Sequence, residues 1–255
     1  MMDWIQGERF MELANNVNIF YRETHGVNTF LKNVPTAEPF VLISHNSDGC
    51  IMSHPNRDDH ANVDLMPYNL VHWFGQNVNV IDRRITSIPL GLENSRWLKK
   101  DPKLIKMEEK LKEPYKIRNL LYINHNVATN PEERQSPYLL FANKDWATLK
   151  RGKNGEGFSA YLDDLCSHQF ILSPQGHGMD TVRTWEALYM GVIPIEKRNL
   201  NNRFYEDLPI CFVNDWEQIT EEFLQREYVR IKTVEWNLEK LNFKYWADKI
   251  LNYDK

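Results

Sequence analysis

The sequence predicts an α/β fold, and three observations support this prediction. Residues 170–196 run as a short apolar stretch, a loop with two glycines, a helical stretch and a second apolar stretch. Gly191 stands between that helix and the second apolar stretch, where a left-handed helix end is expected. Apolar runs of the buried-strand type recur at 39–44 and 119–124. The order strand, helix, strand is that of a βαβ unit in a parallel sheet.

The other elements follow from apolar spacing and from the positions of proline and glycine. Strands are expected at 70–74, 78–81 and 86–90, and helices at 102–112, 131–141, 157–166, 216–229 and 234–251. Residues 113–116 read as a linker. A length of 255 residues allows two small domains, which we place at 1–115 and 116–235.

Composition narrows the class of protein. A net charge of −4 argues against a dedicated nucleic-acid binder. Three separated cysteines predict a reducing compartment and no disulfide framework. The sequence has no apolar run long enough to span a membrane, and residues 1–10 are charged and lack a signal-peptide core. We therefore expect a cytoplasmic protein without a membrane span.

The loop and helix start in the 170–196 unit predict an anion site. Gly176 and Gly178 let backbone N–H groups approach a phosphate, and the helix start adds a partial positive charge. Arg183 can hold phosphate oxygens with its guanidinium, and Glu186 lies on the same helix face, where it can accept hydrogen bonds from ribose hydroxyls. The alternative is structural, with Asp180 capping the helix and Arg183 and Glu186 forming a surface pair.

The run from Ser173 to Ile195 resembles the donor-site signature of exostosin-like glycosyltransferases. The matching positions are Pro174, Gly178, Asp180, Arg183, Trp185, Glu186, Gly191 and Pro194. A softer likeness covers 70–95 and the rest of 120–216. The resemblance implies the GT-B architecture, in which two Rossmann-like domains face each other across a cleft. It also implies that a C-terminal closing helix within 236–255 packs back on the first domain.

The resemblance further implies the substrates and the donor site. The donor would be a nucleotide diphosphate sugar, with a UDP-sugar favoured, and the acceptor a hydroxyl of a glycan or glycoconjugate. No cofactor and no metal would be required, because arginine and the helix start balance the charge of the diphosphate. The expected donor-binding residues are Asn126, Arg134, Pro174, Gly176, His177, Gly178, Met179, Asp180, Arg183 and Glu186. For Arg134, a purely structural place in a capped helix remains open. Lys197, Arg198 and Arg203 are further candidates for the diphosphate, or a solvated basic loop.

The loop after the 39–44 strand holds the candidate base. An inverting transfer needs a group that takes the acceptor's proton, and Asp48 is the first candidate, with His45 the second. Asn46, Trp73 and Asn77 are expected to line the acceptor side, although Trp73 also suits the core. The alternative for Asp48 is a loop-shaping turn.

Two other classes of function stay open. His45, Asp48, His54, Asp58 and His60 are ligand types of metal-dependent hydrolases, although the stretch also reads as a solvated loop. A non-catalytic sugar- or nucleotide-binding protein is the second alternative. The oligomeric state is not determined by the sequence.

Overall fold

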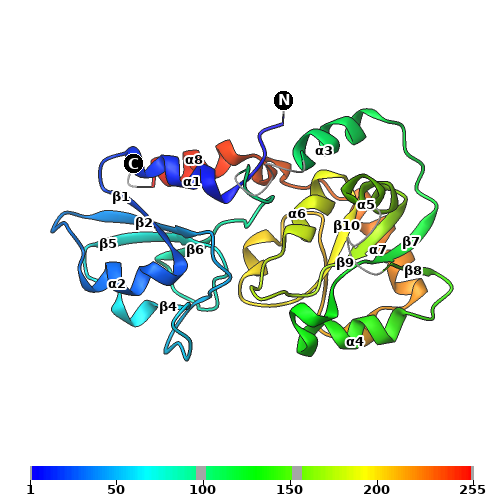
Figure 1. The fold of residues 1–255 in the computed structure, drawn as a ribbon, viewed down its shortest axis with the longest axis horizontal. Helices are drawn as coiled ribbons and strands as arrows, with labels where there is room; N and C mark the ends of the chain where they lie inside the picture. Colours follow the sequence, from blue (N-terminus) through cyan, green and yellow to red (C-terminus); the bar gives the residue numbers. More distant parts are fainter. Residues whose placement is uncertain (1, 96–101, 151–156, 254–255) are drawn as a thin grey trace.

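The computed structural model describes residues 2–95, 102–150 and 157–253, and its two main sheets lie side by side (Figure 1). The first sheet has the order β1-β2-β5-β6, and the second has the order β11-β10-β9-β7-β8. All neighbouring strands pair in parallel. The expected α/β class is therefore confirmed, with Rossmann-like parallel sheets.

The strands of the two main sheets are short, with three to six residues each. Those of the first sheet are β1 (Ile19–Glu23), β2 (Phe40–His45), β5 (Leu70–Gly75) and β6 (Ile85–Ser87). Those of the second are β7 (Asn119–Ile123), β8 (Ala147–Leu149), β9 (His168–Leu172), β10 (Ile193–Lys197) and β11 (Cys211–Val213). A small pair, β3 (Ile51–Met52) and β4 (Ala61–Asn62), stands beside the first sheet.

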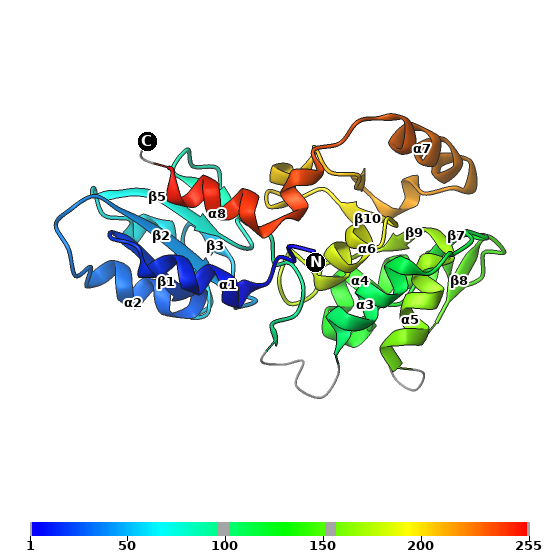
Figure 2. The ribbon, with the colours of Figure 1, turned by 90° about the horizontal axis from the view of Figure 1, so that it is seen from above.

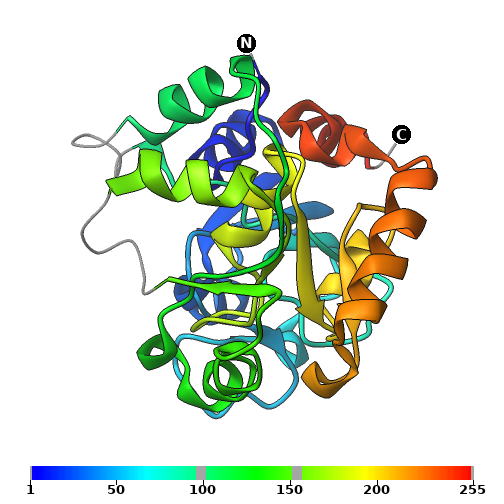
Figure 3. The same cartoon turned by 90° about the vertical axis from the view of Figure 1, so that its right-hand side faces the viewer.

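The helices cover both faces of each sheet. They are α1 (Gly7–Glu12), α2 (Val27–Lys32), α3 (Lys103–Lys112), α4 (Pro131–Phe141), α5 (Gly157–Cys166), α6 (Val182–Tyr189), α7 (Glu221–Thr233) and α8 (Phe243–Leu251). Short 3₁₀ turns stand at 13–15, 24–26, 63–65, 127–129, 202–205, 216–218 and 238–241. Seen from its end in Figure 3, the second sheet has α7 (orange) on the opposite side from α3 and α5 (green).

One hydrophobic cluster joins the two halves. It contains Phe10, Ile43 and Phe74 beside the first sheet, together with Leu162 and Trp185 beside the second. A separate cluster fills the other face of each sheet. Because one continuous core runs under both sheets, the arrangement of the halves is fixed by packing as well as by hydrogen bonds.

The first unit is the part of the chain around the sheet β1-β2-β5-β6, and the second unit is the part around the sheet β11-β10-β9-β7-β8. Helix α3 packs with the second unit, since Lys110 Nζ lies 2.5 Å from Asp163 Oδ1 on α5. The crossing from the first sheet therefore comes before α3. Helix α8 lies against α1 on the first unit, as seen from above in Figure 2. The backbone N–H of Phe243 donates to Asp3 O at 3.0 Å, and its ring centroid is 5.1 Å from that of Phe10.

Several expected boundaries are corrected. Residues 78–81 form no strand, because Val78 makes only an isolated bridge to Ile51 after a left-handed residue at Asn77. The helix expected at 216 begins at Glu221, where the Thr220 side chain caps it. The helix expected at 234 begins at Phe243, after extended backbone and a 3₁₀ turn.

Candidate functional site

The order of the second sheet creates a site where its connections change direction. In chain order its strands read 2-1-3-4-5, so the sheet reverses between β7 and β9. Ligands of doubly wound sheets bind at the carboxyl ends of the strands at this switch point. A cavity of about 1030 Å³ lies there. Its walls are Asn124, His125, Asn126, Val127, Thr129, Arg134, Gln135, Tyr138, Leu139, Thr181, Val182, Arg183 and Glu186.

The end of β7 forms one wall of this cavity. The Asn124 side chain donates to the Tyr122 hydroxyl at 2.6 Å, which fixes its orientation. His125 Nε2 lies 3.0 Å from the carbonyl oxygen of Arg134, and burial lowers the pKa of this imidazole to about 4. A neutral imidazole is therefore expected there at pH 7. The Asn126 side chain accepts from the Ala128 N–H at 3.1 Å and so shapes the following turn.

The start of α6 forms the opposite wall. Thr181 is the N-cap residue, and Arg183 lies in the first turn. A terminal nitrogen of the Arg183 guanidinium donates to the Asn124 carbonyl, which ties the helix start to the end of β7. Its Nε is buried and has no hydrogen-bond partner among the residues that the structure describes. A cation thus stands beside a helix start, an arrangement that favours anions.

Glu186 is a buried wall residue and not half of a surface pair. It is only 2% exposed, and its Oε2 accepts from the Tyr161 hydroxyl at 2.9 Å. A buried carboxylate is costly unless it is hydrogen-bonded, so Tyr161 both satisfies Glu186 and sets its direction.

Arg134 lines the cavity, but its guanidinium mainly binds the protein. It donates from Nε to Gln175 O at 2.7 Å and from Nη1 to Asn126 O at 3.0 Å. Burial, followed by the charge of Arg183, lowers its pKa to about 10. A Cβ added to Gly176 would lie 3.0 Å from Arg134 Nη2, so the glycine permits this close approach. The structural alternative for Arg134 thus has direct geometric support.

The glycine loop is clamped and not open. Asn130 Nδ2 donates to Gly176 O at 2.8 Å, and the Gly176 N–H donates to Gly178 O at 3.0 Å. Pro174, Gly176 and Gly178 are buried, and Met179 is half-buried. None of these residues, nor His177 or Asp180, is among the cavity walls. We expected the cavity to lie directly over the glycine loop, but the loop lies beside the cavity.

Asp180 does not cap α6. Its Oδ1 accepts from Trp185 Nε1 at 2.8 Å, and its Oδ2 accepts from the Leu90 N–H of the first unit at 2.8 Å. Burial raises its pKa to about 6. Glu196, at the end of β10, is also buried, and burial followed by the charge of Asp180 raises its pKa to about 7. The basic residues after β10 are engaged elsewhere, since Arg198 pairs with Glu206 at 2.6 Å and Arg203 donates to Val80 O at 3.1 Å.

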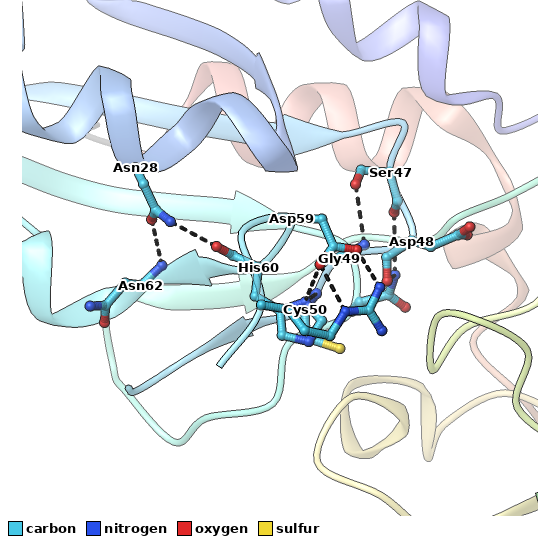
Figure 4. A network of polar contacts seen from close by, with 10 residues as sticks. Asn28, Ser47, Asp48, Gly49, Cys50, Asp59, His60 and Asn62 are labelled. Carbon is cyan, nitrogen blue, oxygen red and sulfur yellow. Dashed lines mark hydrogen bonds and ion pairs between the residues drawn. The ribbon is translucent and has the colours of Figure 1, made fainter. Parts of the chain in front are cut away.

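Asp48 extends from the first unit toward the glycine loop. Its Oδ2 lies 3.7 Å from His177 Nδ1, and both side chains are about two-thirds exposed, at 67% and 63%. Figure 4 shows the polar network behind it, with the Asp48 carboxylate directed away from that network. In it the Gly49 N–H donates to Ser47 Oγ at 3.2 Å, and the Cys50 N–H donates to His60 Nδ1 at 3.1 Å.

The other candidates of the first unit are buried. Trp73 is fully buried and donates from Nε1 to Ser44 Oγ at 2.8 Å, so it belongs to the core. His45 is fully buried too, and its Nδ1 accepts from the Asn46 N–H at 2.8 Å. Its Nε2 must then donate to Pro89 O at 2.9 Å. Burial lowers the pKa of this imidazole, which is thus neutral and inaccessible to an acceptor.

Asn46 and Asn77 bind other protein groups. Asn46 Nδ2 donates to the Tyr21 hydroxyl at 2.7 Å, and its Oδ1 accepts from Asn94 at 2.9 Å. Asn77 is 1% exposed. The expectation that Trp73 and Asn77 line an acceptor surface is corrected, because burial removes both from contact with a bound glycan.

The His/Asp stretch does not form a metal centre. His54 is exposed and pairs with Asp64 at 2.9 Å, Asp58 is exposed, and His60 accepts from the Cys50 backbone. Within residues 2–95, 102–150 and 157–253, no group of three His, Cys, Asp or Glu side chains is placed to hold a metal ion. The arrangement gives the hydrolase alternative no ligand set.

The sequence interpretation missed the apolar part of the cavity wall. Val127, Tyr138 and Leu139 line it together with Gln135. Tyr138 follows Arg134 by four residues, so the helical spacing of α4 was the available signal.

Comparison with protein-family models finds no match for this chain, and a search of curated proteins finds no similar sequence. In the described ranges, every helix is too short or too polar to cross a bilayer.

Proposed function

We propose that the protein is a GT-B-type glycosyltransferase related to the exostosin-like enzymes. It would move a sugar from a nucleotide diphosphate sugar, with a UDP-sugar favoured, to a hydroxyl of a glycan or glycoconjugate. The observation that carries the proposal is the cavity at the switch point of the second sheet, which joins Arg183, Glu186 and an apolar wall.

The walls of the cavity offer three kinds of side chain, which match the phosphates, the ribose and the base of a nucleoside diphosphate. Arg183 and the start of α6 suit the phosphates. Glu186, buried and hydrogen-bonded, suits the ribose hydroxyls. Val127, Tyr138 and Leu139 offer apolar contact for a flat base. The cavity volume of about 1030 Å³ is ample for such a ligand.

The placement of Asp48 supports transfer rather than binding alone. It comes from the first unit and faces His177 on the loop that Arg134 and Asn130 tie to the cavity wall. In the proposed reaction, Asp48 takes the proton of the acceptor hydroxyl as that oxygen attacks the sugar carbon. The bond from that carbon to the diphosphate oxygen breaks, with inversion. Arg183 and the start of α6 stabilise the negative charge on the departing diphosphate.

Calorimetric titration of UDP, GDP, CMP and ADP into the protein tests the donor site. We expect one nucleotide to bind with an affinity that is unchanged by a chelator. Arg183→Ala should weaken that binding by about 10- to 100-fold, because a charge-assisted hydrogen bond is worth roughly 1.5–3 kcal/mol.

Arg198→Ala is the matched control, because Arg198 is an exposed arginine paired with Glu206 outside the cavity. It should leave the affinity unchanged. If no nucleotide binds, or if both variants bind as well as the wild type, the donor-site assignment is wrong.

A further inference from the structure

We infer that Asn77 is a positioning residue that holds the loop of Asp48 against the glycine loop of the second unit. The structural part of this inference stands on contacts alone, and its catalytic consequence rests on the proposed function. Asn77 follows β5 at the carboxyl edge of the first sheet, beside the loop that carries Asp48.

The backbone of Asn77 is unusual and its side chain is enclosed. Its φ is +55°, in the left-handed region that asparagine tolerates better than most residues. Its side chain is 1% exposed, which leaves it no contact with solvent or with a large ligand. A buried amide requires partners for both its oxygen and its nitrogen.

Those partners come from both units. Asn77 Oδ1 accepts from the Asp180 N–H at 2.9 Å in the second unit. Asn77 Nδ2 donates to the carbonyls of Ser47 at 3.5 Å and Asp48 at 3.4 Å in the first. The partners also fix the orientation of the amide, since an N–H faces its oxygen and carbonyls face its nitrogen.

Gly178 supplies a second, independent observation. A Cβ added to this glycine would lie 2.6 Å from Asn77 Nδ2, well inside contact distance. The glycine loop therefore closes directly onto the amide of Asn77. Two segments of the chain, 47–48 and 178–180, therefore meet at the side chain of Asn77.

The contacts of the Asn77 side chain set the position of Asp48 relative to the second unit. The described residues that line the cavity all belong to the second unit, whereas Asp48 comes from the first. Val78 and Ser87 both bind Asn201 across the same interface, but neither of these contacts involves Asp48 or the glycine loop. Loss of the Asn77 side chain should thus displace Asp48 relative to a bound donor and leave the donor cavity intact.

Two variants test the inference. Asn77→Gly keeps the left-handed backbone and removes the side chain. Gly178→Ala adds a methyl group on the second unit that would clash with the Asn77 amide. We expect each to lower kcat about 10- to 100-fold, because a small misplacement of a reacting group has effects of that size. The dissociation constant for the nucleotide should stay within about twofold of the wild-type value, since the cavity is unchanged.

Hydrogen exchange gives a readout that does not depend on activity. Amide exchange in residues 47–49 and 177–180 should become faster together in both variants. Asn18→Gly is the matched control, because Asn18 also has a left-handed backbone, with φ +60°, but is exposed and precedes β1, at the opposite end of the first sheet from the Asp48 loop. It should change neither kcat nor exchange in these two segments.

The results of these experiments distinguish failure of the inference from failure of the proposed function. Unchanged kcat and unchanged exchange in Asn77→Gly would overturn the inference. A parallel loss of donor affinity, kcat and thermal stability would also overturn it, since Asn77 would then serve only the general fold. If the wild-type protein binds no nucleotide, the proposed function fails, and the exchange experiment still decides whether Asn77 ties the two loops together.

Discussion

The Tyr161 hydroxyl donates a 2.9 Å hydrogen bond to Glu186 Oε2, from α5 to the neighbouring α6. Tyr161 is buried and lies outside the cavity walls, whereas Glu186 lines them. Burial, followed by the charge of Glu186, raises the pKa of Tyr161 well above its ordinary value, so the phenol keeps its proton and acts as a donor. The direction of Glu186 is therefore set from behind by a residue that the ligand does not touch.

Tyr161→Phe should weaken nucleotide binding about three- to tenfold, because a hydrogen bond contributes roughly 1 kcal/mol and its loss removes a contact that orients Glu186. Calorimetric titration measures the change. Tyr115→Phe is the matched control, since its phenol binds Met190 O at 3.2 Å at the far end of α6. Equal affinity for wild type and Tyr161→Phe would show that Glu186 does not depend on this contact.

Asp48→Asn should abolish most of the transfer, with kcat reduced by about 10²–10⁴-fold, the usual contribution of a general base. Donor affinity should be unchanged, because Asp48 lies outside the cavity. The measurement is turnover of the nucleotide sugar identified by titration, with Asp58→Asn as an exposed aspartate control in the same loop region. Full turnover by Asp48→Asn would remove Asp48 from the mechanism.

Arg134→Lys should destabilise the protein by about 2 kcal/mol, since a lysine cannot reproduce a guanidinium's hydrogen bonds to several carbonyls at once. The carbonyls concerned are those of Gln175 and Asn126. Urea unfolding measures the free-energy change. The exposed Arg118→Lys should be neutral by comparison. A neutral result for Arg134→Lys would mean that these contacts add nothing to folding.

Glu196→Gln should alter the dependence of stability on pH. The folded-state pKa of Glu196 is raised from 4.5 to about 7, so the folded protein binds its proton more tightly than the unfolded chain does. The stability that this protonation gives is fully present below about pH 4.5 and is lost as the pH rises through about 7. Glutamine does not titrate, so the variant lacks this pH-dependent contribution to stability.

The difference in unfolding free energy between Glu196→Gln and wild type should therefore shift in favour of the variant between pH 5 and pH 8, by on the order of 2 kcal/mol. Thr184 can still bond to the new amide, because a hydroxyl both donates and accepts. Urea unfolding at the two pH values gives the difference. A free-energy difference that is the same at both pH values would show that the pKa of Glu196 is not raised in the folded protein.

How much the sequence could predict depended on the range of the interactions involved. The unit at 170–196 was predictable because local signals mark it, with Gly191 at φ +71° ending α6 before β10. The first sheet was harder, since β1 is half-buried throughout and shows no alternation of apolar and polar residues. Its position is fixed by pairing with β2, which a local pattern does not contain.

In the candidate site too, the residues marked by local sequence signals were the predictable ones. Arg183 and Glu186 were identified from helical spacing and the resemblance, and the structure brings both to the cavity. Arg134 and Asn77 show the limit, because an arginine or an asparagine suits a ligand and a backbone carbonyl equally well. Only the fold shows that the partners of Asn77 come from two distant loops.

The contact of α8 with the first unit has a consequence for how the chain folds during synthesis. Tyr253 packs on His72 with ring centroids 3.9 Å apart, and Lys244 N–H donates to Asp3 Oδ2 at 2.7 Å. The first sheet leaves the ribosome early, yet the helix that covers it follows more than 150 residues later, after the whole second sheet. Until then Phe10 and its neighbours lack part of their cover, so a nascent chain stalled before α8 should expose an apolar face that chaperones recognise.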